Sequence, residues 1–276
     1  MQIRHSSNPK DAKHYDTERL RNEYLIESLM QPNEVTLVYS QIDRVITGTA
    51  VPTAQALTLA AGDALRASSF LQRRELGIIN LGGNGTVIVG QQRYSLEKLD
   101  CLYVGRGEAD PIFESDAAND PALFYFVSTP AHKEYPTTKA TQADANPIHL
   151  GSLETSNERT IFQYIHEKGV ASCQLVMGLT LLKTGSVWNT FPAHTHDRRM
   201  EVYFYFNLEE QDRVMHLMGE PNETRHIVVK NHQAVLSPSW SIHSGAGTRN
   251  YGFIWAMAGE NQAFDDMDAI DLNDFK

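Results

Sequence analysis

The hydrophobic and polar positions of this chain form short runs that predict β-strands rather than long helices. Runs rich in β-branched and aromatic residues lie at residues 34–39, 44–47, 76–81, 86–89, 102–104 and 122–127. Turn sequences such as residues 82–85 (Gly-Gly-Asn-Gly) separate them. One segment, residues 16–30, has apolar residues at helical spacing, with Thr17 as a candidate N-terminal cap. We therefore predict an all-β protein, a sandwich or barrel, with a few short helices.

The run pattern also predicts two domains. A stretch rich in proline and threonine, residues 135–147, is typical of a linker, and a second set of strands follows from Thr160 to Ala258. The sequence at residues 73–81 is similar to that at residues 198–208, which favours two copies of one barrel, although so short a repeat can also arise by chance. We expect an N-terminal domain at residues 1–145 and a C-terminal domain at residues 146–276.

Composition narrows the class of partner and compartment. The net charge of −10 argues against nucleic acid as a partner. The N-terminus lacks an apolar signal region, and no stretch reaches the length of a membrane span. The two cysteines, Cys101 and Cys173, form no CxxC pair, which fits a reducing compartment. We expect a cytoplasmic protein without a membrane or nucleic-acid partner, ending in an acidic tail.

The candidate chemistry lies in the second half of the chain. His194 and His196 are two residues apart, so on an extended strand both imidazoles face the same side. Glu201 opens an aromatic strand, and a turn between it and His196 is needed to bring its carboxylate to the same side. His243 follows a second strand that a proline interrupts. These four residues predict a site for one divalent transition metal, and the lack of cysteine argues against a closed structural zinc site.

Side chains alternate between the two faces of a strand, and this alternation predicts the neighbours of these ligands. Tyr203 and Tyr205 share a strand face with Glu201, and Ser239 and Ser241 share a face with His243. This predicts a polar pocket around the ion. The alternative is that a histidine pair with one intervening residue is a chance feature of the surface. The first copy of the repeat lacks the corresponding histidines, so we expect only the C-terminal domain to bind metal.

The spacing of the four ligands resembles the two metal motifs of the cupin superfamily, and two tandem copies would form a bicupin with two jelly-roll barrels. The resemblance has two departures. Ser239 and Trp240 stand where a glycine is usual before the second-motif histidine, and Gly247 stands where an asparagine is usual. Both departures argue against a general cupin oxygenase.

Longer segments are similar to the 5-keto-4-deoxyuronate isomerase family, also called 4-deoxy-L-threo-5-hexosulose-uronate ketol-isomerases. They span nearly the whole chain, at residues 21–23, 41–44, 73–77, 102–105, 155–157, 188–196, 198–206, 223–228, 237–245, 259–262 and 265–268. This resemblance implies a cytoplasmic aldose–ketose isomerase of pectin breakdown, which forms 3-deoxy-D-glycero-2,5-hexodiulosonate. It also implies a homohexamer and zinc held by His194, His196, Glu201 and His243, with manganese or iron as other candidates.

An aldose–ketose exchange passes through an enediol, whose developing negative charge a Lewis-acidic metal stabilises. Parity makes Tyr203 a candidate acid or hydrogen-bond donor, although a tyrosine of the core would give the same pattern. Arg199 and Arg225 are candidates for binding the substrate carboxylate, because a guanidinium pairs with it bidentately.

Other functions stay open at this point. Three histidines and one glutamate also suit an iron-dependent cupin dioxygenase, and an isomerase acting on 5-deoxyglucuronate in inositol breakdown would have a similar architecture. A sugar-acid sensor without catalytic activity is a further alternative, although the sequence shows no DNA-binding partner domain.

Overall fold

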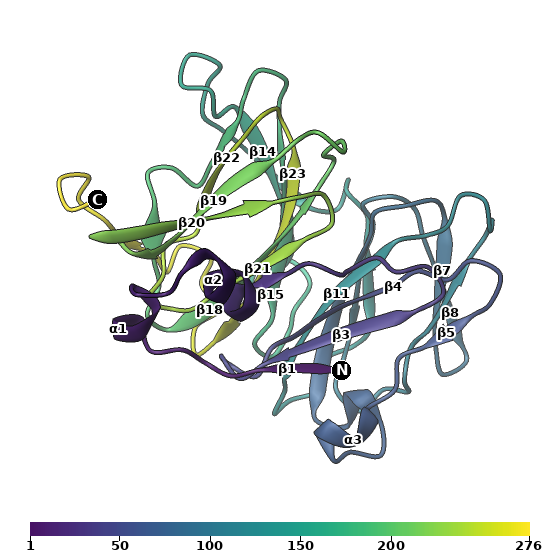
Figure 1. Cartoon of the computed structure of the whole chain (residues 1–276). Coiled ribbons are helices and arrows are strands. Elements are labelled where there is room, and N and C mark those ends of the chain that lie inside the picture. The colour runs from purple at the N-terminus through teal and green to yellow at the C-terminus, as the bar shows by residue number, and fades with distance from the viewer. The chain divides into compact units, whose positions relative to one another are not determined.

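The computed structural model describes all residues of the chain, 1–276, and they form two compact units (Figure 1). The first unit contains Met1–Arg4, Ser28–Ala145 and Tyr164–Val176, and the second contains His5–Glu27, Asn146–Gln163 and Met177–Lys276. The expected division after residue 145 is one of several points at which the chain passes between units. The expected ranges 1–145 and 146–276 assumed two continuous domains, whereas each unit is built from several separate segments.

The first unit is a barrel of two sheets. The larger sheet has seven strands in the order β1-β3-β4-β11-β6-β9-β12, and the smaller has four in the order β5-β10-β7-β8. Their bounds are β1 (Gln2–Arg4), β3 (Val35–Ser40), β4 (Ile46–Ala50), β5 (Leu57–Thr58), β6 (Arg74–Asn80), β7 (Gly85–Val89), β8 (Gln92–Leu96), β9 (Cys101–Val104), β10 (Ile112–Ser115), β11 (Phe124–Pro130) and β12 (Thr138–Ala140).

Apolar side chains fill the interior of the first barrel. Phe113 from the smaller sheet stacks on Phe126 from the larger one, with ring centroids 5.8 Å apart. Residues of β4, β6, β7, β8, β9 and β11 also contribute to this core. The buried carboxylate of Glu75 accepts hydrogen bonds from the hydroxyls of Tyr103 and Thr129 and from three backbone N–H groups of residues 173–175. This barrel therefore holds a carboxylate whose acceptor capacity is already used.

The second unit contains a barrel of similar design. Its larger sheet has seven strands in the order β13-β14-β15-β23-β18-β21-β2, and its smaller sheet has four in the order β16-β22-β19-β20. A further pair, β17-β24, stands apart. Their bounds are β2 (Leu25–Ile26), β13 (Asn146–Leu150), β14 (Arg159–Ile165), β15 (Val176–Leu182), β16 (Trp188–Asn189), β17 (His194–Thr195), β18 (Arg199–Phe206), β19 (Val214–Glu220), β20 (Glu223–Val229), β21 (Ala234–Ser237), β22 (Ser244–Gly247), β23 (Gly252–Gly259) and β24 (Asp268–Ala269).

Strand β18 is the centre of the second barrel. It pairs with β23 along its whole length and with β21 along part of it, and all eight of its residues are buried. Because side chains alternate along a strand, Glu201 and Tyr203 face one side together, and both line the pocket described below. The expectation that Glu201 and Tyr203 share one face of the strand is therefore confirmed.

The helices are few and short, as expected for an all-β chain: α1 (Pro9–Ala12), α2 (Thr17–Tyr24), α3 (Gly62–Leu65) and one 3₁₀ turn at Phe70–Gln72. Asp16 caps α2, because its side chain accepts a hydrogen bond from the backbone N–H of Arg19, so the expected cap at Thr17 is wrong. The predicted helix also ends early, since Leu25 and Ile26 pair with β21 instead. No helix is long and apolar enough to cross a membrane.

Candidate metal centre

Four side chains from different parts of the second barrel converge on one point, and they are the four that the sequence singled out. Their ligand atoms, from His194, His196, Glu201 and His243, all lie within 4.8 Å of one another. His194 belongs to β17, Glu201 to β18, and His243 directly precedes β22. The turn between β17 and β18 carries His196 and brings Glu201 to the same side.

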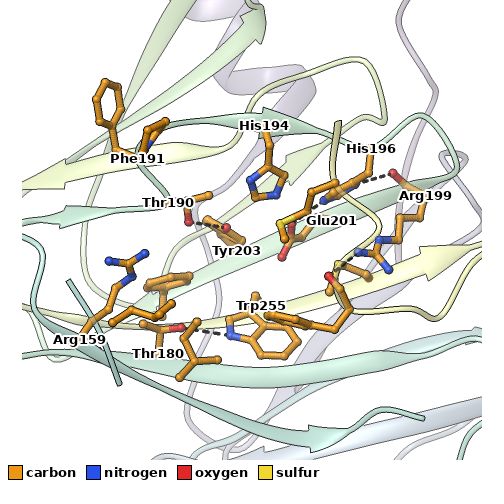
Figure 2. A pocket seen from close by; sticks show the side chains of 17 residues that line it. Arg159, Thr180, Thr190, Phe191, His194, His196, Arg199, Glu201, Tyr203 and Trp255 are labelled. Carbon is orange, nitrogen blue, oxygen red and sulfur yellow. Dashed lines mark hydrogen bonds and ion pairs between the residues drawn. The ribbon is translucent and has the colours of Figure 1, made fainter. Parts of the chain in front are cut away.

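The distances within this cluster describe a compact set of acceptors. The Nε2 atoms of His194 and His243 are 3.1 Å apart. One carboxylate oxygen of Glu201 lies 2.9 Å from Nε2 of His243 and 3.2 Å from Nε2 of His196. Figure 2 shows His194, His196 and Glu201 pointing toward one another from the upper side of the pocket.

The outer ring nitrogens indicate which tautomer the histidines adopt. Nδ1 of His196 lies 3.2 Å from the carbonyl oxygen of Arg199, and Nδ1 of His243 lies 3.4 Å from that of Ser241. An Nδ1–H that donates to a carbonyl leaves Nε2 with a lone pair directed inward. Lone pairs of neutral imidazoles and a carboxylate that face one another need a cation between them, so the donor set fits a divalent metal.

Electrostatics keep this set ready to bind a cation. Burial, together with a smaller contribution from the neighbouring His243, lowers the pKa of His194 to about 3, so its imidazole is neutral. Burial by itself raises the pKa of Glu201, but the adjacent imidazoles of His243 and His196 outweigh this effect and hold that pKa below its usual value. Glu201 is therefore ionised. A neutral imidazole and an ionised carboxylate are the protonation states that metal binding requires.

A cavity of about 270 Å³ opens beside the cluster. His194, His196 and Glu201 form part of its lining, and most of the remaining wall is apolar or aromatic: Leu150, Ile161, Phe191, Pro192, Phe253, Trp255, Met257, Phe264 and Met267. A cavity with apolar walls and a few convergent polar groups is the usual form of a small-molecule site.

Tyr203 lies in this cavity next to the ligands. Its hydroxyl is 2.9 Å from Oγ1 of Thr190, and its ring centroid is 5.4 Å from that of His243. Burial and the charge of Glu201 raise the pKa of Tyr203 well above its usual value, so the phenol keeps its proton. The side chain is thus placed where a hydrogen-bond donor toward a bound molecule is needed, and its role in catalysis stays a prediction.

The two arginines expected to bind a carboxylate are engaged elsewhere. Arg199 lines the cavity, but its terminal nitrogens donate to the backbone carbonyls of four residues, namely Asn261, Ala263, Phe264 and Asp266. Arg225 lies outside the cavity on β20, where it forms an ion pair with Glu223 at 3.0 Å and donates to the carbonyl of Lys13. Neither guanidinium end is free for a ligand in this pocket, which corrects the expectation for both residues.

Three of the four expected polar neighbours also lie elsewhere. Tyr205 is fully buried and its hydroxyl is 2.7 Å from Nδ1 of His216. Ser241 accepts from the backbone N–H of Gly219, and Ser239, like Tyr205 and Ser241, is absent from the cavity lining. The alternation of side chains does not extend to the two serines, because strand β21 ends at residue 237, before both of them.

Among the lining residues that the sequence did not predict, one is charged. Arg159, on β14, points into the cavity, and Nη1 of its guanidinium donates to the carbonyl oxygen of Asn157 at 2.9 Å. Arg159 belongs to no recognisable local motif and lies far from the histidines in sequence. The one available signal was that it lies close to residues 155–157, which are similar to the isomerase family.

Known proteins resemble this chain over its full length. A relative from Lachnoclostridium phytofermentans, named 4-deoxy-L-threo-5-hexosulose-uronate ketol-isomerase, is 59% identical over 276 residues and covers 100% of both chains. A protein of the same name from Caldicellulosiruptor bescii is 56% identical over 276 residues, again covering 100% of both.

Solved structures of lower identity share the fold alone. An IolB-like protein from Salmonella typhimurium matches with a TM-score of 0.68 at 15% identity, covering 87% of this chain and 94% of the other. An oxalate decarboxylase from Lactobacillus farciminis matches with a TM-score of 0.61 at 10% identity, covering 91% and 88%. These matches confirm the expected class of two cupin-like barrels. The sequence itself matches the KduI/IolB family over residues 24–273, and the chain therefore belongs to that family.

Proposed function

We propose that this protein is a 4-deoxy-L-threo-5-hexosulose-uronate ketol-isomerase that uses one divalent metal, zinc, held by His194, His196, Glu201 and His243. The observation that carries the proposal is the convergence of four metal acceptors beside an apolar cavity, in a chain 59% identical to a ketol-isomerase of that name. In this proposal the protein acts on a small keto-uronate, and the product is 3-deoxy-D-glycero-2,5-hexodiulosonate.

The substrate name defines what the pocket must do. A hexosulose uronate has an aldehyde at C1, a ketone at C5 and a carboxylate at C6, so the ketol exchange occurs between C1 and C2, at the end remote from the carboxylate. The proton on C2 moves to C1 and the hydroxyl proton on O2 moves to O1, through an enediol. A divalent metal, when bound, supplies a Lewis acid that stabilises negative charge on the two adjacent oxygens.

The protein side chains make three further contributions. The neutral phenol of Tyr203 donates a hydrogen bond to a substrate oxygen at the reacting end, because burial and the charge of Glu201 keep it protonated. The apolar wall, including Phe253 and Trp255, keeps water away from the enediol. The hydrogen bond of Thr190 to Tyr203 fixes the direction of the phenol oxygen.

The test is a substrate panel under argon with metal analysis of the purified protein. We expect turnover of the hexosulose uronate without oxygen, with the 2,5-diketo acid identified by NMR, and about one zinc per chain. Turnover that requires oxygen would establish a dioxygenase instead. Preference for 5-deoxyglucuronate would establish the inositol-pathway isomerase, and binding without turnover would indicate a sensor.

The proposal extends to the biological setting that this activity implies. We propose a cytoplasmic enzyme of pectin breakdown that works as a homohexamer. The support is the family resemblance together with full-length relatives of the same name. Light scattering coupled to size-exclusion chromatography tests the assembly, because a hexamer has about six times the mass of the 31.0 kDa chain.

A further inference from the structure

The cavity beside the metal centre contains few charged groups. Its lining includes one carboxylate that belongs to the metal set, Glu201, and two guanidinium groups, Arg159 and Arg199. A uronate brings one carboxylate into this largely apolar space. Transfer of an unpaired carboxylate away from water is costly, so one of the two arginines must pair with it.

The terminal nitrogens of Arg199 are occupied by its own hydrogen bonds, and only its buried Nε, which cannot by itself pair bidentately with a carboxylate, lacks a partner. Its Nη1 donates to the carbonyls of Asn261 and Ala263, and its Nη2 donates to those of Phe264 and Asp266, which uses all four terminal hydrogens. Its side chain is almost completely buried. A substrate that took these donors would leave four backbone carbonyls without partners.

In contrast to Arg199, Arg159 has most of its hydrogen-bond donors unused. Its guanidinium makes a single hydrogen bond, from Nη1 to the carbonyl of Asn157 at 2.9 Å, and no acidic residue pairs with it. Burial lowers the pKa of Arg159, but a guanidinium stays charged at any ordinary pH. A partly desolvated cation without a counterion favours an anionic ligand. Its Nε–H and Nη2–H form the parallel donor pair that matches a carboxylate.

The position of Arg159 fits the order of functional groups along the substrate. In the view of Figure 2, Arg159 and Arg199 lie at opposite ends of the pocket, with Tyr203 and Glu201 between them. The metal ligands and Tyr203 define the end where C1 and C2 react. In a six-carbon uronate the carboxylate is at the other end of the chain, which is where Arg159 reaches into the cavity.

We propose that Arg159 binds the substrate carboxylate side-on through Nε and Nη2, and so sets which carbons of the uronate reach the metal ligands. The inference rests on the proposed function for the identity of the substrate. It makes Arg159 the residue that distinguishes a uronate from a neutral sugar of the same length, since a substrate without the carboxylate leaves this cation buried and unpaired.

The experiment compares the uronate with its uncharged methyl ester in the wild type, in Arg159→Gln and in Arg159→Lys. For Arg159→Gln we expect kcat/KM for the uronate to fall about 100-fold, mainly through KM, while the value for the ester changes less than about threefold. Arg159→Lys keeps the charge but loses the parallel donor pair, and it should recover part of the loss. Arg225→Gln, which lies outside the cavity, serves as the matched control and should behave as wild type.

A second measurement does not depend on turnover. Calorimetric titration of the uronate into chelator-treated protein should give binding that Arg159→Gln weakens about 100-fold, with the ester unaffected. Equal losses for uronate and ester, with normal zinc content, would overturn the role of Arg159. A wild type that binds the uronate through Arg159 but does not isomerise it would overturn the proposed function while the carboxylate site stands.

Discussion

The contrast between two buried glutamates shows how surroundings decide the use of one side chain. Glu201 faces three imidazole nitrogens and no backbone donor, so its charge is available to a cation. Glu75, on the first barrel's strand β6, accepts from three backbone N–H groups and two hydroxyls. A buried glutamate is therefore available as a metal ligand in one barrel and acts as a structural anchor in the other.

Paired substitutions test this contrast. We expect Glu201→Gln to weaken zinc binding by at least about 100-fold, since an amide cannot replace the anionic ligand, with a matching loss of activity. Glu75→Gln should leave zinc content unchanged and lower the free energy of unfolding by about 1–3 kcal/mol, because the amide N–H₂ faces backbone donors. Zinc analysis and urea unfolding measure the two effects. Zinc loss in Glu75→Gln would contradict the assignment.

Tyr203 offers a test of the proposed hydrogen-bond donor. Removing only the hydroxyl in Tyr203→Phe should lower kcat by about 10²-fold while zinc content and KM stay near wild type, because the phenol acts on the reacting end of the substrate. Steady-state kinetics with parallel zinc analysis measure this. Full turnover in the variant would leave Tyr203 as an ordinary residue of the core.

Among the elements, the segment after β23 has the clearest link to function. Arg199 donates to four backbone carbonyls between residues 261 and 266. Arg198 forms ion pairs with Asp266 at 2.7 Å and Asp268 at 2.8 Å. The same segment supplies two residues to the cavity wall, Phe264 and Met267. The pairing of β17 with β24 ties this wall to the strand that carries His194.

Loosening this segment should therefore affect substrate more than metal. We expect Asp266→Asn to raise KM several-fold, because it weakens the pairing with Arg198 and lets the cavity wall move, while zinc content stays constant. Asp271→Asn, at an exposed position nearby in sequence, is the control. Kinetics and limited proteolysis of the C-terminal segment measure the change. Unaltered KM together with unaltered proteolysis would show that the ion pairs do not hold the wall.

The elements themselves could be predicted where apolar runs were clear. The predicted strand at 76–81 corresponds to β6 (Arg74–Asn80) and that at 122–127 to β11 (Phe124–Pro130). Short polar strands such as β12 and β13 fall in or beside the predicted linker, because edge strands bury few side chains and leave little periodicity. Arg159 and the C-terminal wall were missed for a related reason: the fold creates their proximity to the histidines.

At the scale of the whole molecule, the three tryptophans allow one unit to be observed separately. Trp188, Trp240 and Trp255 all belong to the second unit, which also holds the four metal ligands. Zinc at about 100 times its Kd should stabilise that unit by about 2.7 kcal/mol. We expect chelation to shift the tryptophan-monitored urea transition to lower urea, with a smaller shift in circular dichroism. Coincident transitions with identical shifts would indicate that both units unfold as one.

The class of fold and the members of the histidine–glutamate cluster could thus be predicted from sequence, because both depend on local periodicity and on residue type. Which segments of the chain form each unit could not be predicted. Nothing in residues 5–27 indicates that they belong with the second unit, since Leu25 and Ile26 acquire their partners on β21 only through the fold.

This last pairing has a consequence for biosynthesis. The ribosome makes Leu25 and Ile26 long before their partners Val235 and Ala234. At translation rates of about 5–20 residues per second, the delay is roughly 10–40 s. During that time this short apolar strand has no edge to join, whereas most strands of the first unit find their neighbours within the chain already made. The nascent chain therefore passes through a stage in which the first barrel is complete but the segment at residues 5–27 has no partner, and in that period it is most open to chaperones and to aggregation.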